Sequence, residues 1–126
     1  EGSAFDLPIA IGILAASGQI SSERLDHLLI LGELSLDGSL RSIRGALSIA
    51  IAARNAGYKG LVLPAENARE AAMVRGIDVF PVQSLAEAAA FLNGVYGIEP
   101  FHVDMEEVFA DQRHYLIDFR DVRGQE

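Results

Sequence analysis

Few residues of this chain are of types that carry out chemistry, and their spacing limits what they can do. Ser3 precedes a long apolar stretch, and it would be a nucleophile only beside a general base. The histidines, His27, His102 and His114, are too far apart in the sequence to match a metal-binding spacing, so we interpret them as solvated surface residues. The chain has no cysteine, which excludes disulfides, thiolate metal sites and a cysteine nucleophile. From composition alone, no active site is identified.

One stretch of the chain is rich in basic residues: Arg41, Arg44, Arg54 and Lys59. A solvated face is our first interpretation of it, and a DNA contact is the alternative. The formal net charge of −8, from 10 basic and 18 acidic residues, disfavours a general phosphate-binding surface because an acidic body repels DNA. No phosphate loop of the G-x-x-x-x-G-K-[ST] type is present. We interpret the pair Glu66-Asn67 as a capped loop at a helix start.

Length and hydropathy indicate one domain. The chain has 126 residues, 50% of them hydrophobic, which is enough for one compact core and too little for two ordinary domains. No apolar run reaches the roughly 18 residues needed to cross a membrane, and no signal peptide is visible. We therefore expect a cytoplasmic location without membrane contact. Because Glu1 leads straight into a helical pattern without an initiator Met, we also expect that preceding residues have been cut away.

The pattern of apolar residues, glycines and capping residues predicts alternating helices and strands. Helices are predicted over 3–17, with Asp6 as its cap and Gly18 as its stop, and over 21–25, 45–55, 65–75 and 84–92, the last capped by Ser84. Strands are predicted over 28–36, 39–43, 60–64 and 77–82, with a two-residue hairpin turn at Asp37-Gly38. This order favours an α/β (α+β) arrangement with some parallel pairing. Residues 94–117 are interpreted as a linker or arm, with a short acidic helix over 104–112.

Several motifs resemble a known family. The run G-E-L-S-L-D-G-S-L-R at 32–41, Gly45, A-R-N-A-G at 53–57 and L-P-A-E-N at 63–67 are similar to the C-terminal proteolytic domain of Lon. Together with E-G-S-A-F-D-L-P at 1–8, they resemble more closely the Lon-like N-terminal region of the magnesium-chelatase-like AAA+ ATPases of the ComM/YifB family. The resemblance implies a Lon-like domain over 1–93, with a mixed sheet, a β-hairpin and packed helices, lacking its N-terminal strands. Residues 118–126 resemble the lead-in to an AAA+ module.

The same resemblance implies that the catalytic positions are empty. Lon cuts peptides with a serine nucleophile and a lysine base. Its serine falls on Ala4 and its lysine on Leu47, and neither side chain can attack a carbonyl or take a proton. Ser3 is one residue away, a rotation of about 100° on a helix. The guanidinium groups of Arg41 and Arg44 stay protonated and cannot act as bases. We therefore expect no peptidase activity.

What the resemblance implies about function follows from these positions. We expect a non-catalytic interaction or regulatory domain of a magnesium-chelatase-like AAA+ ATPase. Its parent would be a DNA-recombination and branch-migration motor in natural transformation. ATP and Mg²⁺ are expected for the parent, and no cofactor or metal for this fragment. DNA contact, where made, is expected at Arg41, Arg44, Arg54 and Lys59. Two alternatives stay open: a serine peptidase using Ser3, and a magnesium-chelatase subunit of tetrapyrrole biosynthesis.

The expected partners are the parent's own AAA+ module, neighbouring subunits and a second copy of the chain. In the Lon-like fold, strands preceding Glu1 share a sheet with the hairpin predicted over 28–43. Their loss would leave an open edge beside an apolar face formed by Leu28, Ile30, Leu34 and Leu36. An unpaired edge recruits another strand. We therefore predict self-association, or docking of the tail over 95–118 onto the sheet.

Overall fold

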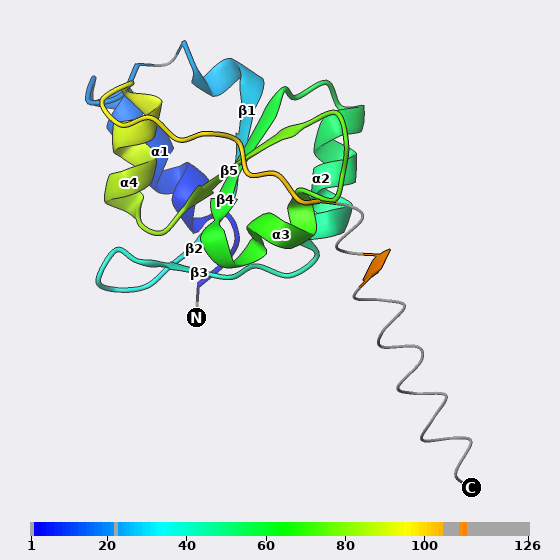
Figure 1. Ribbon diagram of the computed structural model, residues 1–126. Coiled ribbons are helices and arrows are strands. Elements are labelled where there is room, and N and C mark those ends of the chain that lie inside the picture. Colours follow the sequence, from blue (N-terminus) through cyan, green and yellow to red (C-terminus); the bar gives the residue numbers. More distant parts are fainter. Residues whose placement is uncertain (1, 22, 105–108, 111–126) are drawn as a thin grey trace, which may run out of the picture.

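The computed structural model describes residues 2–21, 23–104 and 109–110 (Figure 1). Strands and helices alternate along the chain, as the sequence pattern predicts. The α-helices are α1 (Asp6–Ala16), α2 (Ala46–Asn55), α3 (Ala68–Ala71) and α4 (Leu85–Leu92), and the 3₁₀ turns are η1 (Leu25–His27) and η2 (Ala65–Asn67). The strands are β1 (Leu28–Ile30), β2 (Glu33–Leu34), β3 (Leu40–Arg41), β4 (Gly60–Pro64) and β5 (Asp78–Val82).

The central sheet is parallel, with strand order β1-β4-β5. Its register pairs Leu29 with Leu61 and Leu61 with Val79. β2 and β3 form a separate antiparallel hairpin below it (Figure 1). All of β4 is buried, as expected for a parallel strand with both faces covered by helices. The α/β (α+β) fold class predicted from the sequence is confirmed.

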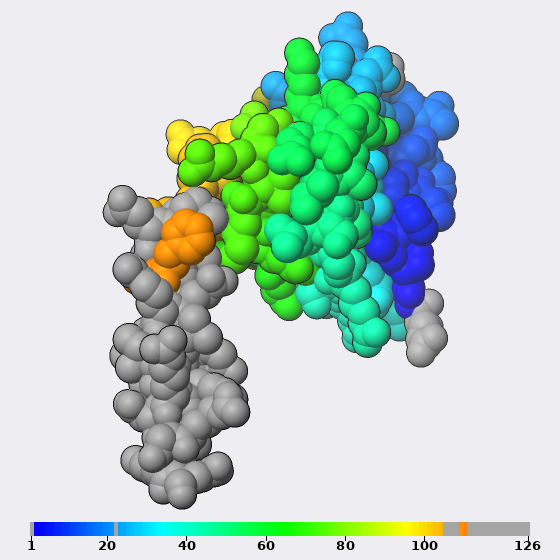
Figure 2. Space-filling model, turned by 90° about the vertical axis from the view of Figure 1, so that its right-hand side faces the viewer, coloured from blue at the N-terminus to red at the C-terminus, as the bar shows by residue number. Residues whose placement is uncertain are grey.

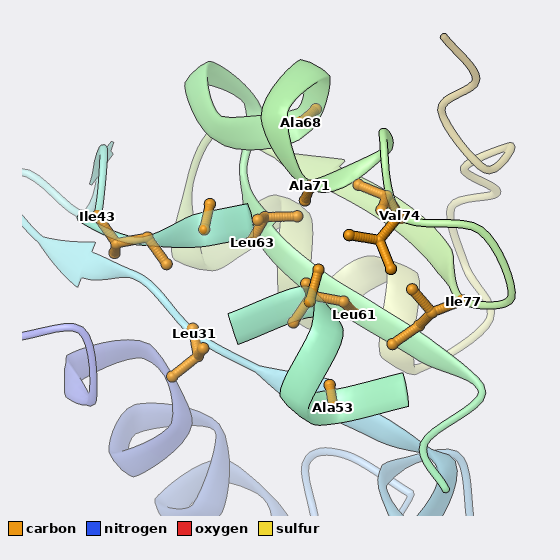
Figure 3. Packing of buried hydrophobic residues seen from close by; sticks show 12 residues of the cluster. Leu31, Ile43, Ala53, Leu61, Leu63, Ala68, Ala71, Val74 and Ile77 are labelled. Atoms are coloured by element: carbon orange, nitrogen blue, oxygen red, sulfur yellow. The ribbon is translucent and has the colours of Figure 1, made fainter. Parts of the chain in front are cut away.

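One face of the sheet carries the first hydrophobic core, which is covered by α2 and α3. Leu61 and Leu63 of β4 point into it, and Ala53 of α2 and Ala71 of α3 pack against them (Figure 3). Small alanines on both helices let the helix backbones approach the strand closely. This face anchors α2, the helix that carries Leu47.

The opposite face carries the second core, which is covered by α1 and α4. Because strand side chains alternate, Val62 of β4 points away from Leu61 and into this core. Leu7 and Ile11 of α1 pack there with Ile30 of β1, and all three are buried. The helix α1 is therefore fixed to the sheet by one side only.

The segment predicted as one strand over 28–36 is two strands in different sheets, so that prediction is wrong. After β1, the N–H of Gly32 donates to the Ala4 carbonyl at 2.8 Å, and the Gly32 carbonyl accepts the N–H of Leu7 at 2.9 Å. These bonds to α1 use backbone groups that a continuous strand would need for its own ladder. A side chain at Gly32 would also meet Leu40 at 3.0 Å.

The hairpin turn is longer than the two residues predicted. The N–H of Ser35 donates to the Ser39 carbonyl at 2.9 Å, which leaves residues 36–38 as the loop. The Asp37 carboxylate accepts the N–H of Ser39 at 3.0 Å and its hydroxyl at 2.6 Å. The expected apolar face does not form, because Leu36 is fully exposed at the tip, whereas Leu28 and Ile30 belong to the parallel sheet.

Helix ends follow the sequence signals in part. Gly18 and Gly57 adopt the positive φ values, 81° and 94°, that end α1 and α2. Ser84 caps α4 as predicted, since its hydroxyl accepts the N–H of Glu87 at 3.1 Å. Asp6 is not the cap of α1: the residue in that position is Phe5, and no side chain caps the helix. The helix predicted over 65–75 is also shorter, with only η2 and α3 regular.

The start of the predicted arm lies against the sheet. The N–H of Phe101 donates to the Val79 carbonyl at 2.7 Å. Since the N–H of Asp78 bonds to Lys59 on the β4 side, the groups of Val79 and Pro81 face the outer edge of β5. Pro81 has no N–H to leave unpaired there, as is usual at a sheet edge. The start of the arm therefore bonds to the outer edge of β5 at Phe101. Residues 118–126 and most of the predicted acidic helix lie outside the described residues.

Candidate functional site

Ala4 and Leu47, on which the sequence resemblance places the Lon catalytic pair, both belong to segments that pack against the first core, although Leu47 itself is 38% exposed. Ala4, just before α1, is partly buried and packs against the first core, and its carbonyl is bonded to Gly32. Leu47 is the second residue of α2 and follows Ala46, which is fully buried in that core. The folded chain thus brings both segments to one region. Neither a methyl group nor an isobutyl group can attack a carbonyl or accept a proton.

Ser3 is held in a local turn at the helix start. Its hydroxyl accepts the N–H of Phe5 at 3.0 Å, and its own N–H donates to the Asp6 carboxylate at 3.1 Å. A second N–H, from Leu34, reaches the same Asp6 oxygen at 3.1 Å. Asp6 therefore ties the start of α1 to β2, and it contacts the Ser3 backbone rather than its hydroxyl.

An open hollow of about 620 Å³ lies beside this turn, between the N-terminus and the hairpin. Its charged lining residues are Asp6, Glu33, Asp37 and Arg41. Three carboxylates against one guanidinium make the hollow unfavourable for an anionic ligand. None of these lining residues is a lysine or a histidine that could serve as a general base for Ser3.

Two charged side chains of this hollow, Asp37 and Arg41, are hydrogen-bonded within the hairpin. The Ser39 side chain donates to the Asp37 carboxylate, which lowers the pKa of that group below its usual value of 3.8. The Ser39 backbone N–H and the positive charge of Arg41 act in the same direction. Arg41 in turn donates from Nε to the Ser35 hydroxyl at 3.1 Å. Arg41 is thus partly engaged by its own hairpin.

The predicted basic stretch does not form one patch. Arg41 and Arg44 lie before α2, and Arg54 and Lys59 lie at or beyond its other end. Because α2 has 10 residues, the two pairs are about 15 Å apart along the helix axis. The four side chains are all exposed, as the interpretation as a solvated face requires.

Arg54 is hydrogen-bonded to Arg75, a residue that the sequence analysis did not single out. Its Nη1 donates to the Arg75 carbonyl at 3.2 Å, and its side chain lies 3.1 Å from where a Cβ on Gly76 would be. The two arginines are 21 positions apart, so no spacing rule brings them together. Arg54 thus links the C-terminal end of α2 to the loop at Arg75. Its positive charge at this end of the helix also complements the helix dipole.

Asn67 is the buried polar residue that holds the loop before α2. It is 6% exposed, and its side chain pairs with the backbone of Ile43 in both directions. Its Oδ1 accepts the Ile43 N–H at 2.8 Å, and its Nδ2 donates to the Ile43 carbonyl at 2.9 Å. The interpretation of Glu66-Asn67 as a helix cap is wrong, since no side chain caps η2 or α3. Asn67 instead bonds to the backbone of Ile43 as a neighbouring strand would. It thereby holds in place the loop that carries Arg44 and leads into α2.

A second hollow, of about 470 Å³, is mostly apolar and lies on the α4 side of the sheet. Phe80 and Phe91 both line it, with ring centroids 4.9 Å apart. Arg24 donates to the Phe91 carbonyl at 2.9 Å and lies 5.8 Å above that ring. His27 is at its rim, exposed, as the sequence interpretation expects. His102 is exposed as well, and His114 is outside the described residues.

In residues 2–21, 23–104 and 109–110, no group of three or more His, Cys, Asp or Glu side chains could hold a metal ion. In the same ranges, no helix is long and apolar enough to cross a membrane.

Fold and site together define a mixed α/β domain with alanine at position 4 and leucine at position 47. The family model described as subunit ChlI of Mg-chelatase matches residues 1–67. The uncharacterised protein YifB of Salmonella typhimurium is 39% identical over 127 positions, covering 100% of this chain and 24% of YifB. Competence protein ComM of Haemophilus influenzae is 40% identical over 94 residues, covering 75% of this chain and 18% of ComM.

A third relative, an uncharacterised protein of Mycobacterium tuberculosis, is 42% identical over 97 residues, covering 77% of this chain and 19% of that protein. This chain therefore belongs to the magnesium-chelatase ChlI-like family that includes YifB and ComM. It spans a quarter or less of the length of these curated relatives. The family resemblance stated from the sequence is confirmed.

Proposed function

We propose that this chain is a non-catalytic, Lon-like interaction domain of a magnesium-chelatase-like ATPase. The observation that carries the proposal is the pair Ala4 and Leu47, two inert side chains on segments that pack against one core. Peptide hydrolysis by a Lon-type site needs a hydroxyl and an amine at these positions. A folded domain without these two groups is consistent with a role in binding other domains or subunits rather than in catalysis.

A serine peptidase using Ser3 is disfavoured by the same geometry. The Ser3 hydroxyl accepts a bond from the backbone of Phe5, and the hollow beside it is lined by carboxylates and Arg41. An arginine remains protonated at working pH and cannot take the hydroxyl proton. Within the described residues, the Ser3 hydroxyl donates no hydrogen bond to a carboxylate or to any other base, because Asp6 is bonded to the Ser3 backbone N–H, so the activation of a nucleophile is missing.

Labelling with a serine-reactive phosphonate tests this part of the proposal. Intact-mass measurement should show no phosphonate adduct on the chain after prolonged exposure. The Ser3→Ala variant is the matched control, because its exposed side chain can be shortened without disturbing the core. An adduct on the wild-type chain that is lost in Ser3→Ala would refute the assignment as non-catalytic.

The parent activity is proposed from the relatives. The name of ComM refers to competence, and all three relatives extend far beyond the matched region. We infer an ATP- and Mg²⁺-dependent motor acting on DNA during natural transformation, with nucleotide bound by the parent rather than by this domain. Titration of this chain with ATP and Mg²⁺ should give no binding heat. A micromolar dissociation constant for ATP would contradict the proposal that nucleotide is bound outside this domain.

A second candidate is a subunit that inserts magnesium into a tetrapyrrole. The description of the family model matched over 1–67 favours it. The parent protein should then form magnesium porphyrin from protoporphyrin, Mg²⁺ and ATP in the presence of the remaining chelatase subunits. Absence of that product, together with ATP-driven branch migration on a Holliday junction, would favour the DNA motor.

DNA contact by the domain, where the parent makes it, is proposed at the Arg44 end of α2. The Arg44 side chain has no hydrogen bond or ion pair within the described ranges, whereas Arg54 is engaged with Arg75. Arg44→Glu in the parent should weaken duplex binding and lower the salt slope by about 0.9 per lost phosphate contact. Arg75→Glu, at an exposed arginine outside the predicted DNA-contact set, is the matched control. Equal slopes for wild type and Arg44→Glu would remove this contact.

A further inference from the structure

Asn93 attaches the loop that follows α1 to the end of α4. Its Oδ1 accepts the N–H of Ser21 at 3.2 Å, and its Nδ2 donates to the Gln19 carbonyl at 2.7 Å. The bonded residues are 72 and 74 positions apart in the sequence. Arg24, in the same loop, donates to the Phe91 carbonyl at 2.9 Å. The side-chain amide of Asn93 therefore uses both its oxygen and its nitrogen to hold this loop.

Asn93 is also the one asparagine of the chain that precedes a glycine, because Asn55 and Asn67 are each followed by alanine. Asparagine is a thermolabile residue type. An Asn-Gly pair reacts most readily, since glycine has no side chain to hinder attack by its backbone nitrogen. A Cβ on Gly94 would meet nothing within 4 Å, so the space beside this nitrogen is open. The Asn93 side chain is exposed, so water reaches it.

We propose that Asn93 is a site of spontaneous deamidation and that its conversion loosens the loop from α4. The Gly94 nitrogen attacks Cγ of Asn93 and gives up its proton, while the Cγ–Nδ2 bond breaks and ammonia leaves. The new C–N bond closes a five-membered succinimide. Water then adds to one of the two ring carbonyls and opens the ring to aspartate or isoaspartate. No electrons are transferred, so the reaction needs no oxidant or reductant.

The native backbone slows the first step. The ψ angle of Asn93 is −3°, and the Gly94 N–H donates to the Phe91 carbonyl at 3.1 Å. This nitrogen therefore points toward Phe91 rather than toward Cγ of Asn93. The side-chain amide is in turn held by Gln19 and Ser21. Ring closure requires these bonds to open, so the rate depends on local opening of the junction rather than on global unfolding.

The product holds the loop less well than the amide does. An aspartate at position 93 can still accept the Ser21 N–H, but its second oxygen faces the Gln19 carbonyl without a proton to donate. Its negative charge also lies at the C-terminal end of α4, where the helix dipole disfavours an anion. Ile20 belongs to the second core, so the domain stays folded while the part of the loop at Arg24 loosens.

Peptide mass spectrometry of the wild-type chain, incubated in mildly alkaline buffer with and without urea, tests the reaction. In urea, Asn93 should convert faster than Asn55 and Asn67, which are the internal controls. In the folded chain, Asn93 should convert roughly tenfold or more slowly than in urea, and still measurably. Equal rates at the three asparagines in urea, equal rates at Asn93 in both states, or no conversion in the folded chain would overturn the proposal.

Trypsin cleavage after Arg24 measures the loosening. The Asn93→Asp variant, which carries one of the two products, should be cleaved there about tenfold faster than the wild type, because cleavage follows the population of the opened loop. Asn55→Asp is the matched control: it places the same charge at the C-terminal end of α2, on the face shown in Figure 2 and across the sheet from α4. Equal cleavage rates in the two variants would show that Asn93 does not hold this loop, and would overturn the proposal.

Discussion

Replacing Asn67 with alanine tests whether the loop before α2 is held from a distance. The substitution removes both bonds to Ile43, at 2.8 and 2.9 Å, and leaves a buried N–H and a buried carbonyl without partners. Ile43 is itself in the first core and is 9% exposed, so water does not easily replace the lost amide. The loop that carries Arg44 would lose its fixed position.

The expected loss of stability follows from these two groups. An unsatisfied buried donor or acceptor costs roughly 2 kcal/mol, so Asn67→Ala should lower the free energy of unfolding by about 4 kcal/mol. For a domain of this size, that corresponds to a fall in Tm of roughly 15–30 °C. Removing an exposed amide that makes one long bond should cost less than about 0.5 kcal/mol.

Urea denaturation followed by circular dichroism measures the difference directly. Asn55→Ala is the matched control, since the exposed Asn55 only accepts a bond from Arg54 at 3.4 Å. The Asn67→Asp variant adds a test of the direction in which stability changes with pH. Its protonated carboxyl can donate to the Ile43 carbonyl, so its folded-state pKa is raised, and the free energy of unfolding of this variant should fall as the pH rises above the ordinary aspartate pKa of about 3.9. A loss below about 1 kcal/mol for Asn67→Ala, or equal losses at Asn67 and Asn55, would refute the reasoning.

Other substitutions should have smaller and equally specific effects. Gly60→Ala should lower the free energy of unfolding by about 1–3 kcal/mol, since the added Cβ would lie 2.5 Å from the partly buried Leu28 side chain and 2.8 Å from the Phe80 ring. Gly12→Ala, with nothing within 4 Å, should instead raise it by up to about 1 kcal/mol; calorimetry showing the same sign for both would contradict this packing. Ser84→Ala should cost about 1 kcal/mol in urea denaturation through loss of the α4 cap, and no loss would show that the cap is not used. The carboxyl of Asp37 should titrate below 3.8 in an NMR titration, and Ser39→Ala should move its pKa upward; because the folded pKa is lowered, the stability from this group is lost as pH falls through that range.

What the sequence predicts correctly is decided by neighbours along the chain. Gly18 and Gly57 end helices because only glycine adopts positive φ without strain, and that requirement is local. The apolar run of β4 is predicted residue for residue, since a short run between glycine and proline signals leaves few alternatives. The cap at Ser84 is also set by residues within one turn.

What the sequence misses is decided by residues far away in the chain. The break between β1 and β2 depends on bonds from Gly32 to Ala4 and Leu7, some 25 positions earlier. The role of Asn67 depends on Ile43, 24 positions away, so the same residue read locally resembles a cap. Tertiary contacts of this kind leave no periodic signal in a single sequence.

For the candidate site, too, some features are predictable from the sequence and others only from the fold. Ala4 and Leu47 follow from motif spacing, because the inert residue types are visible in the sequence itself. That both segments pack against one core is visible only in the fold. The separation of Arg44 from Lys59 along α2 is likewise a property of the folded helix.

The rate of casein hydrolysis tests the central claim, that this family member carries a non-catalytic Lon-like domain, most directly. Fluorescent unfolded casein should be cleaved by the purified chain, and by its full-length parent with ATP and Mg²⁺, no faster than by buffer. The Ser3→Ala variant, measured in parallel, should give the same background rate. Cleavage above background by the wild type that Ser3→Ala abolishes would contradict the account.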